Sequence, residues 1–230
     1  APRPSVAYYD RAHSAFSQAA PEDFAWDDAL RGTKIFLSSG ITPALGPSPA
    51  RCVEHGLRRA RELGCKVAFD LNYRSKLWSV AEASKAIKPL MEYVDILFAS
   101  IADAHHLLGV AADPPAEVPR RVAEAYGIET VTTIYNPSEP GVTWRAATYH
   151  KGETYFADQT GPFTTVDRLG AGDAFAGGFL YGYLKEGVER AVRIGNACMA
   201  LKNTVVGDLN CVSLEDVEDQ IGGERTLVKR

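Results

Sequence analysis

The sequence lacks the features that mark several classes of protein. It has four cysteines in 230 residues and no Cys-x-x-Cys spacing, so neither a metal site nor a disulfide framework is predicted, and buried free thiols are expected. The five histidines show no metal-ligand spacing and are expected at the surface. No apolar run is long enough to span a bilayer and no signal peptide is visible, so the expected location is the cytoplasm. A formal net charge of −4 disfavours binding to nucleic acid or to a membrane surface.

What is present is typical of a soluble globular protein. Short apolar runs alternate with longer amphipathic ones, which predicts an α/β fold with a mostly parallel sheet. Strands are expected at residues 34–37, 66–71, 95–99 and 130–135, followed by an antiparallel hairpin at 142–148 and 154–157. Helices are expected at residues 49–63, 81–93, 102–108, 117–126, 174–185 and 188–205, with a short last helix capped by Ser213 and Asp216. Ser48 is expected to cap the first helix, and Pro49 to open it.

Residues 167–178 carry the most informative motif, Asp-Arg-Leu-Gly-Ala-Gly-Asp-Ala-Phe-Ala-Gly-Gly. Gly170 and Gly172 permit a tight turn and the close approach of a ligand, because glycine has no Cβ. The helix expected to follow would present free N–H groups at the positive end of its dipole, which suits a phosphate. Asp173 at that end is a candidate to take a proton from an attacking hydroxyl. The plainer interpretation of a short Gly-x-Gly-Asp is a helix N-cap.

Two arginines lie where a parallel sheet binds ligands, just beyond the predicted strands. Arg74 follows the strand at 66–71; it is suited to holding an acid group or a developing phosphate, or else to pairing with Asp70. Arg11, beside Tyr9, is suited to binding a carboxylate bidentately, or else to a solvated pair with Asp10. The residues alone leave both alternatives open.

The glycine motif resembles the second signature of the ribokinase-like (PfkB-type) carbohydrate kinases, Asp-Thr-x-Gly-Ala-Gly-Asp-x-Phe, and departs from it at Arg168. Arg168 and four further stretches resemble the 2-keto-3-deoxygluconate kinases of that family. These stretches are Tyr-x-Arg-Ala-x-Ser-Ala (9–15), Ser-Gly-Ile-Thr-Pro-Ala-Leu (39–45), Asp-x-Asn-Tyr-Arg-x-x-Leu-Trp (70–78) and Lys-Asn-Thr-x-x-Gly-Asp (202–208). The resemblance covers nearly the whole chain.

The resemblance implies a ribokinase-like three-layer α/β/α fold with a mostly parallel central sheet, in a single kinase domain over residues 1–230. It implies ATP-dependent phosphorylation of the terminal hydroxyl of 2-keto-3-deoxygluconate, with ATP and Mg²⁺ as cofactors. A monovalent cation near Asp167, present in some relatives, is left open. The implied partners are the sugar acid and ATP, with no nucleic acid and no membrane, and a homo-oligomer is expected because many relatives form one.

The resemblance also assigns roles to residues. It implies Asp173 as the catalytic base and an anion hole for the transferring phosphoryl at Gly170, Ala171 and Gly172. Substrate contacts are implied at Tyr9, Arg11, Ile41, Arg74 and Asp208, with the arginines facing the carboxylate. ATP contacts are implied at Ser100, Thr133, Gly170, Gly172 and Asn196.

Some features depart from the family. Ser100 and Asp103 occupy the place of an Asn-x-x-Glu motif near the phosphate and Mg²⁺, and no Lys-x-Gly-x-x-Gly nucleotide loop follows residue 131. Relatives carry a further N-terminal segment of roughly a quarter to a third of their length, so the N-terminal strand and most of the β lid are expected to be absent and the chain is interpreted as a fragment. Two alternative functions remain: a kinase for a neutral sugar such as ribose or fructose, and a non-catalytic sugar- or nucleotide-binding paralogue.

Overall fold

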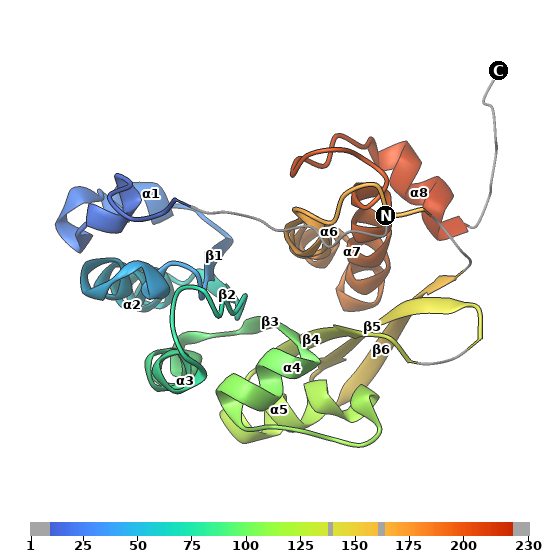
Figure 1. The fold of residues 1–230 in the computed structure, drawn as a ribbon, viewed down its shortest axis with the longest axis horizontal. Coiled ribbons are helices and arrows are strands. Elements are labelled where there is room, and N and C mark those ends of the chain that lie inside the picture. Colours follow the sequence, from blue (N-terminus) through green and yellow to red (C-terminus); the bar gives the residue numbers. More distant parts are fainter. Residues whose placement is uncertain (1–9, 138–139, 161–163, 223–230) are drawn as a thin grey trace. The chain divides into compact units, whose positions relative to one another are not determined.

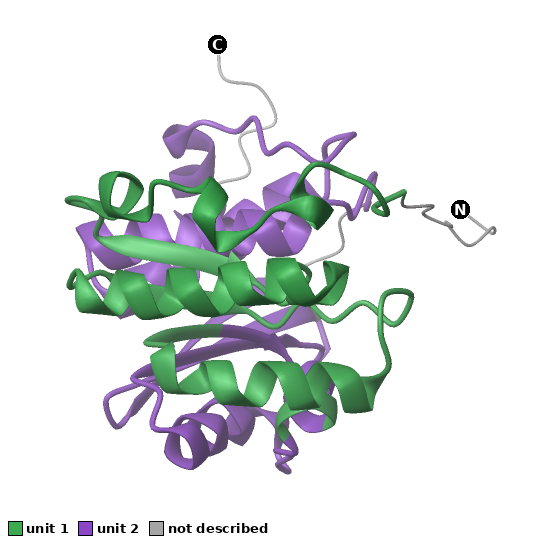
Figure 2. Ribbon diagram, turned by 90° about the vertical axis from the view of Figure 1, so that its left-hand side faces the viewer, with its two compact units in different colours: residues 1–97, 106–108 green, residues 98–105, 109–230 purple. Residues whose placement is uncertain are grey.

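The computed structural model describes residues 10–137, 140–160 and 164–222 of the chain. The backbone divides into two compact units, shown in different colours in Figure 2. Unit 1 comprises residues 1–97 with 106–108, and unit 2 comprises residues 98–105 with 109–230. The strands form one six-stranded sheet whose order follows the chain, from β1 to β6.

Unit 1 is built on two parallel strands joined by a helix (Figure 1). Strand β1 (Ile35–Ser39) pairs in parallel with β2 (Lys66–Asp70), and Ser39 lies opposite Asp70 at the end of the pair. Helix α2 (Pro47–Glu62) connects them and buries Val53 and Leu57. The sequence placed the start of this helix at residue 49 with Ser48 as its cap. Instead, the helix begins at Pro47 after Gly46, whose φ of 144° only glycine adopts readily.

The other helices of unit 1 follow local signals. Helix α3 (Val80–Ile87) begins with a capping box, in which Ser79 and Glu82 exchange hydrogen bonds. The single helix expected at residues 81–93 is instead divided, because Pro89 cannot donate to the helical ladder and the chain continues as a 3₁₀ helix (Lys88–Tyr93). The sequence also missed 3₁₀ helices at Phe16–Gln18 and Pro21–Asp23 and the short α1 (Trp26–Leu30).

Unit 2 contains the antiparallel part of the sheet. Strand β3 (Ile96–Ser100) crosses the boundary between the units, and α4 (Ile101–Asp103) and a π-helical turn (Ala104–Leu108) follow it. Helix α5 (Val118–Tyr126) precedes β4 (Thr130–Tyr135). Strands β5 (Val142–His150) and β6 (Glu153–Thr160) form the predicted hairpin. Lys151 and Gly152 make its turn with positive φ angles of 47° and 101°.

Three helices complete unit 2. Figure 1 shows α6 (Ala171–Lys185) beside α7 (Val188–Lys202), with α8 (Leu214–Gly222) after them. The two long helices pack closely: a Cβ on Gly182 of α6 would lie 2.7 Å from Cα of Ala191 on α7. Ser213 and Asp216 cap α8 as predicted. Helix α7 ends at Lys202, three residues before the expected end at 205.

The surface and core differ in part from the sequence expectations. Cys52 and Cys65 are buried as expected, whereas Cys198 is half-buried and Cys211 is exposed, and all four thiols are free. His55 and His150 are half-buried rather than at the surface, and His150 contacts the hydroxyl of Thr130 at 2.8 Å. Across the described ranges, no helix is long and apolar enough to cross a membrane.

Candidate active site

The glycine motif forms the N-terminal end of helix α6. Gly170 is the N-cap residue and adopts a left-handed backbone with φ of 77°, and its carbonyl accepts the first helical hydrogen bond from Ala174 at 2.8 Å. The N–H of Ala171, which the resemblance places in the anion hole, instead donates to the carbonyl of Arg168 at 3.2 Å. Within the described residues, the N–H groups of Gly170, Gly172 and Asp173 have no acceptor. These three donors lie at the positive end of the α6 dipole, an arrangement that suits an anion.

Asp173 lies in the first turn of α6 and its side chain is exposed. No hydrogen bond or ion pair to it exists in the part of the chain that the structure describes. The helix-cap interpretation of Asp173 therefore fails, because the N-cap position is occupied by Gly170. A carboxylate that caps nothing and faces solvent beside three free N–H donors is available for chemistry with a substrate.

The loop before α6 is held by the loop after α7. The carboxylate of Asp167 accepts hydrogen bonds from the N–H groups of Leu169 and Gly207, each at 3.0 Å. The carbonyl of Asn203 accepts from the N–H groups of Val166 and Asp167, at 2.8 and 3.3 Å. These backbone N–H donors hold the pKa of the Asp167 carboxyl below its ordinary value, with the Leu169 N–H as the largest cause. The loop before α6 is thus tied to the loop after α7 by both side-chain and backbone hydrogen bonds.

Gly170 also brings Asp208 into the site. A Cβ built on Gly170 would lie 2.2 Å from the carbonyl oxygen of Asp208, so the two backbones are in direct contact. Asp208 itself is exposed and follows Gly207, whose φ is 87°. The structure therefore joins two segments that the sequence analysis could only name separately, the anion hole and the predicted substrate contact at Asp208.

The residues expected on the sugar side lie in unit 1. Gly40 donates its N–H to the carbonyl of Asp70 at 2.8 Å, and a Cβ on Gly40 would lie 2.1 Å from the carbonyl oxygen of Leu71. The two loops that follow β1 and β2 therefore touch. Ile41 belongs to the first of these loops and is half-buried, while Arg74 belongs to the second and is exposed.

Arg74 forms no ion pair or side-chain hydrogen bond with any residue in the described ranges, so the alternative in which it pairs with Asp70 is not observed. Arg11 is half-buried, and its carbonyl accepts the hydroxyl of Ser14 at 3.0 Å. Tyr9 lies outside the described residues. The structure thus brings Ile41 and Arg74 onto adjoining loops, and leaves a guanidinium available for an anionic ligand.

The residues expected on the ATP side are spread over three elements of unit 2. Ser100 caps α4 by accepting the N–H of Asp103 at 2.9 Å, and it is exposed. Thr133 lies in β4 and is completely buried, and its hydroxyl has no partner in the described residues. Asn196, on α7, is 5% exposed, and its Oδ1 accepts the indole N–H of Trp144 at 2.8 Å.

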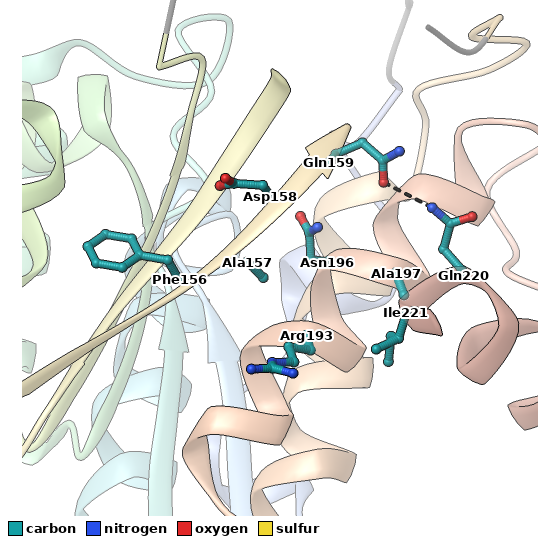
Figure 3. Close-up of a pocket in the computed structure, with 9 residues that line it drawn as sticks. All are labelled: Phe156, Ala157, Asp158, Gln159, Arg193, Asn196, Ala197, Gln220 and Ile221. Carbon is teal, nitrogen blue, oxygen red and sulfur yellow. Dashed lines mark hydrogen bonds between the residues drawn. The ribbon is translucent and has the colours of Figure 1, made fainter. Parts of the chain in front are cut away.

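Asn196 opens into a cavity of about 290 Å³ between β6, α7 and α8 (Figure 3). Asp158 and Gln159 line it from the strand, and Arg193 lines it from the helix one turn before Asn196. The amide of Gln220 donates to Oε1 of Gln159 at 3.2 Å and closes one side. Of these lining residues, only Asn196 was expected from the sequence. The three-residue spacing of Arg193 and Asn196, which places both on one helix face, is a signal that could have indicated Arg193.

Residues 3–215 match the pfkB family of carbohydrate kinases. Two curated proteins are similar to the chain. It is 38% identical to the 2-dehydro-3-deoxygalactonokinase of Haloferax volcanii over 224 residues. This alignment covers 97% of this chain and 68% of the relative. It is 34% identical over 210 residues to the 2-dehydro-3-deoxygluconokinase of Thermoproteus tenax, covering 90% and 59% respectively.

A solved structure gives the same result for the fold. The crystal structure of 2-dehydro-3-deoxygluconokinase from Thermotoga maritima superimposes with a TM-score of 0.88 at 37% identity, covering 96% of this chain and 69% of that one. The expected three-layer α/β fold with a mostly parallel six-stranded sheet is thereby confirmed, with the hairpin of β5 and β6 as its antiparallel part. The chain spans between 59% and 69% of the length of these three proteins. With a matching motif at 167–173 and a matching fold, this chain belongs to the pfkB family of carbohydrate kinases.

Proposed function

We propose that this chain carries the catalytic end of an ATP-dependent sugar kinase that phosphorylates the terminal hydroxyl of 2-keto-3-deoxygluconate, also called 2-dehydro-3-deoxygluconate, or of its galactonate epimer. One observation carries the proposal. Asp173 is exposed and unpartnered in the described structure, beside the free N–H groups of Gly170 and Gly172 at the start of α6. The names of the similar proteins support the sugar class, and they include both epimers.

In the proposed mechanism, Asp173 accepts the proton of the substrate hydroxyl as that oxygen attacks the γ-phosphoryl group. The N–H groups of Gly170, Gly172 and Asp173 donate to the phosphoryl oxygens, where negative charge is concentrated. The Asp167–Gly207 hydrogen bond holds this loop, so no reorganisation is needed during transfer. Positioning then accounts for most of the rate enhancement, as is usual for phosphoryl transfer through a loose transition state.

On the sugar side, we assign Arg11 and Arg74 to the carboxylate of the substrate, with Tyr9, Ile41 and Asp208 as further contacts. Arg74 supports this assignment because its guanidinium is exposed and has no partner among the described residues. A guanidinium can donate two parallel hydrogen bonds to a carboxylate. A neutral sugar such as ribose has no carboxylate. The arginine therefore favours a sugar acid over the neutral-sugar alternative.

On the nucleotide side, we assign the ATP contacts to Ser100, Asn196 and the glycines of the α6 N-terminus. Thr133 is completely buried, so its contact with ATP stays a prediction from the resemblance. The cavity beside Asn196 supports this assignment, because the carboxylate of Asp158 and the amide of Gln159 line it and offer polar groups to a nucleotide (Figure 3). Mg²⁺ would be held mainly by phosphate oxygens of ATP, as is usual for this ion in phosphoryl transfer. When bound there, Mg²⁺ neutralises phosphate charge.

Several expectations stay predictions from the resemblance. These are the single kinase domain over residues 1–230 and the homo-oligomer; the cytoplasmic location stays a prediction from the sequence, and a monovalent cation near Asp167 stays an open question.

The proposal is tested by measuring ADP release from ATP by the complete gene product. The substrates are 2-keto-3-deoxygluconate, its galactonate epimer, ribose, fructose and no sugar. We expect release with the acid sugars alone, and its loss in Asp173→Asn. Release with a neutral sugar alone would favour the kinase of another substrate class. No release with any sugar from a folded protein would favour a binding role.

A further inference from the structure

Among the residues that the structure describes, one charged side chain is completely buried. Lys202, the last residue of α7, is 0% exposed. Among the described residues, the other buried polar side chains belong to Thr, Asn and Gln, which carry no charge. A lysine is almost never fully buried unless its ammonium group has partners, because the loss of hydration is costly. The proposed mechanism gives Lys202 no role, so its burial needs an explanation.

The partners of Lys202 are backbone carbonyls rather than carboxylates. Its Nζ donates to the carbonyl of Val205 at 3.0 Å and to the carbonyl of Asp167 at 3.5 Å. No carboxylate oxygen lies within ion-pair distance of Nζ in the part of the chain that the structure describes, although the charge of Lys202 helps to lower the pKa of the nearby Asp167 carboxyl. The ammonium group therefore does what a bound monovalent cation does: it collects the negative ends of carbonyl dipoles from separate segments.

Those two carbonyls come from the two loops that build the anion hole. Asp167 precedes Gly170 by three residues, and Val205 precedes Asp208 by three residues. The loops are also joined by the hydrogen bond between Gly207 and the Asp167 carboxylate. Lys202 thus bridges the segment that presents the free N–H donors and the segment whose carbonyl fills the space beside Gly170.

We propose that the ammonium group of Lys202 is a built-in cation that holds the anion-hole loop in its working position, so that turnover does not require an added monovalent cation. This inference rests on the proposed kinase function. Lys202 is a positioning residue, because its ammonium contacts protein carbonyls and acts on the phosphoryl group through the loop. It also replaces the open expectation of a diffusible cation near Asp167 with a tethered one.

The test uses Lys202→Ala, which removes the side chain and leaves room for a small cation between the same carbonyls. Rates of ADP release are measured in chloride salts of K⁺, NH₄⁺, Na⁺ and tetramethylammonium at one ionic strength. We expect the wild-type rate to change less than about twofold among the salts. We expect kcat of Lys202→Ala to fall by about 10- to 100-fold in tetramethylammonium, the scale of a misplaced active-site loop, and to recover saturably in NH₄⁺ or K⁺.

Three further variants separate cation binding from packing. Lys202→Met keeps the volume without the charge, so we expect the same loss and no recovery in any salt. Met199→Ala removes a buried side chain of the same helix, and Lys185→Ala removes an exposed cation of α6. We expect neither control to gain a dependence on NH₄⁺ or K⁺.

A readout without catalysis keeps this inference distinct from the kinase proposal. With no substrate present, the thermal midpoint of Lys202→Ala should rise in NH₄⁺ or K⁺ and not in tetramethylammonium, while that of Met199→Ala should not respond. If no sugar is phosphorylated, this measurement still tests the cation site. If Lys202→Ala does not fold, two other measurements test the proposal: how much the wild-type rate depends on the cation, and how far kcat falls in Lys202→Met. Strong activation of the wild type by K⁺, full activity of a Lys202 variant, or a folded Lys202→Ala that no cation restores would each overturn the proposal.

Discussion

Gly170→Ala tests how the anion hole is held. Gly170 has a left-handed backbone with φ of 77°, where a residue with a Cβ loses about 1–2 kcal/mol. The added Cβ would also lie 2.2 Å from the carbonyl oxygen of Asp208, against 3.4 Å for an ordinary contact. The backbone at Asp208 must therefore move by about 1.2 Å, and overpacking of this kind costs about 1–3 kcal/mol. The combined loss of unfolding free energy is about 2–5 kcal/mol.

The matched control is Gly172→Ala, two residues later in the same motif. A Cβ on Gly172 would meet nothing within 4 Å, and its φ is not positive. Alanine is better than glycine inside a helix by about 0.5–1 kcal/mol, so this variant should be slightly stabilised. Its activity is not the readout, because Gly172 belongs to the proposed anion hole.

The assay is thermal and urea unfolding of both variants beside the wild type. For a chain of this size each kcal/mol corresponds to about 2–4 °C, so Gly170→Ala should unfold about 4–20 °C below the wild type. We also expect kcat of Gly170→Ala to fall by about 100-fold, since a displacement of about 1 Å at the loop misplaces the N–H donors. Equal midpoints for Gly170→Ala and Gly172→Ala would refute the contact between Gly170 and Asp208.

Four other expectations follow from the site. Asp173→Asn should lower kcat by about 10²–10⁴-fold without loss of stability. The control Glu186→Gln, at the far end of α6, should leave kcat unchanged. Near-normal turnover of Asp173→Asn would contradict its role as base. Arg74→Ala should raise KM for the sugar acid in initial-rate assays, and an equal rise for a neutral sugar would argue against carboxylate recognition. The pKa of Asp167 is lowered in the folded state, so the ionised carboxylate stabilises the fold at any pH above its unfolded pKa of about 3.9. This stabilisation should fade as the pH falls below that value. In urea unfolding, Asp167→Asn should lack this part of the pH dependence. Asn196→Ala should remove the hydrogen bond that Oδ1 accepts from the Trp144 N–H, destabilise the fold by about 0.5–1.5 kcal/mol and raise KM for ATP alone, whereas an unchanged KM for ATP would remove Asn196 from the nucleotide site.

The regular elements were largely predictable because their signals are local. The alternation of apolar residues gave Thr130–Tyr135 with its observed bounds, and the Lys151-Gly152 turn gave the hairpin. Prediction failed where a local signal had two interpretations. Either proline of Gly-Pro-Ser-Pro could open α2, and the helix begins at Pro47 rather than Pro49 because of the backbone of Gly46. Pro89 was compatible with continuing a helix or leaving it, and the chain became 3₁₀ there.

For the site, the sequence by itself determined which chemistry was available. A glycine-rich turn into a helix, followed by Asp173, predicts an anion site with a carboxylate, because those properties belong to the residues and their spacing. The tertiary structure alone decided which distant segments meet it. The contact of Gly170 with Asp208 and the burial of Lys202 between two carbonyls join segments about 40 residues apart. No local pattern encodes them, since they arise only when α6 and α7 pack together.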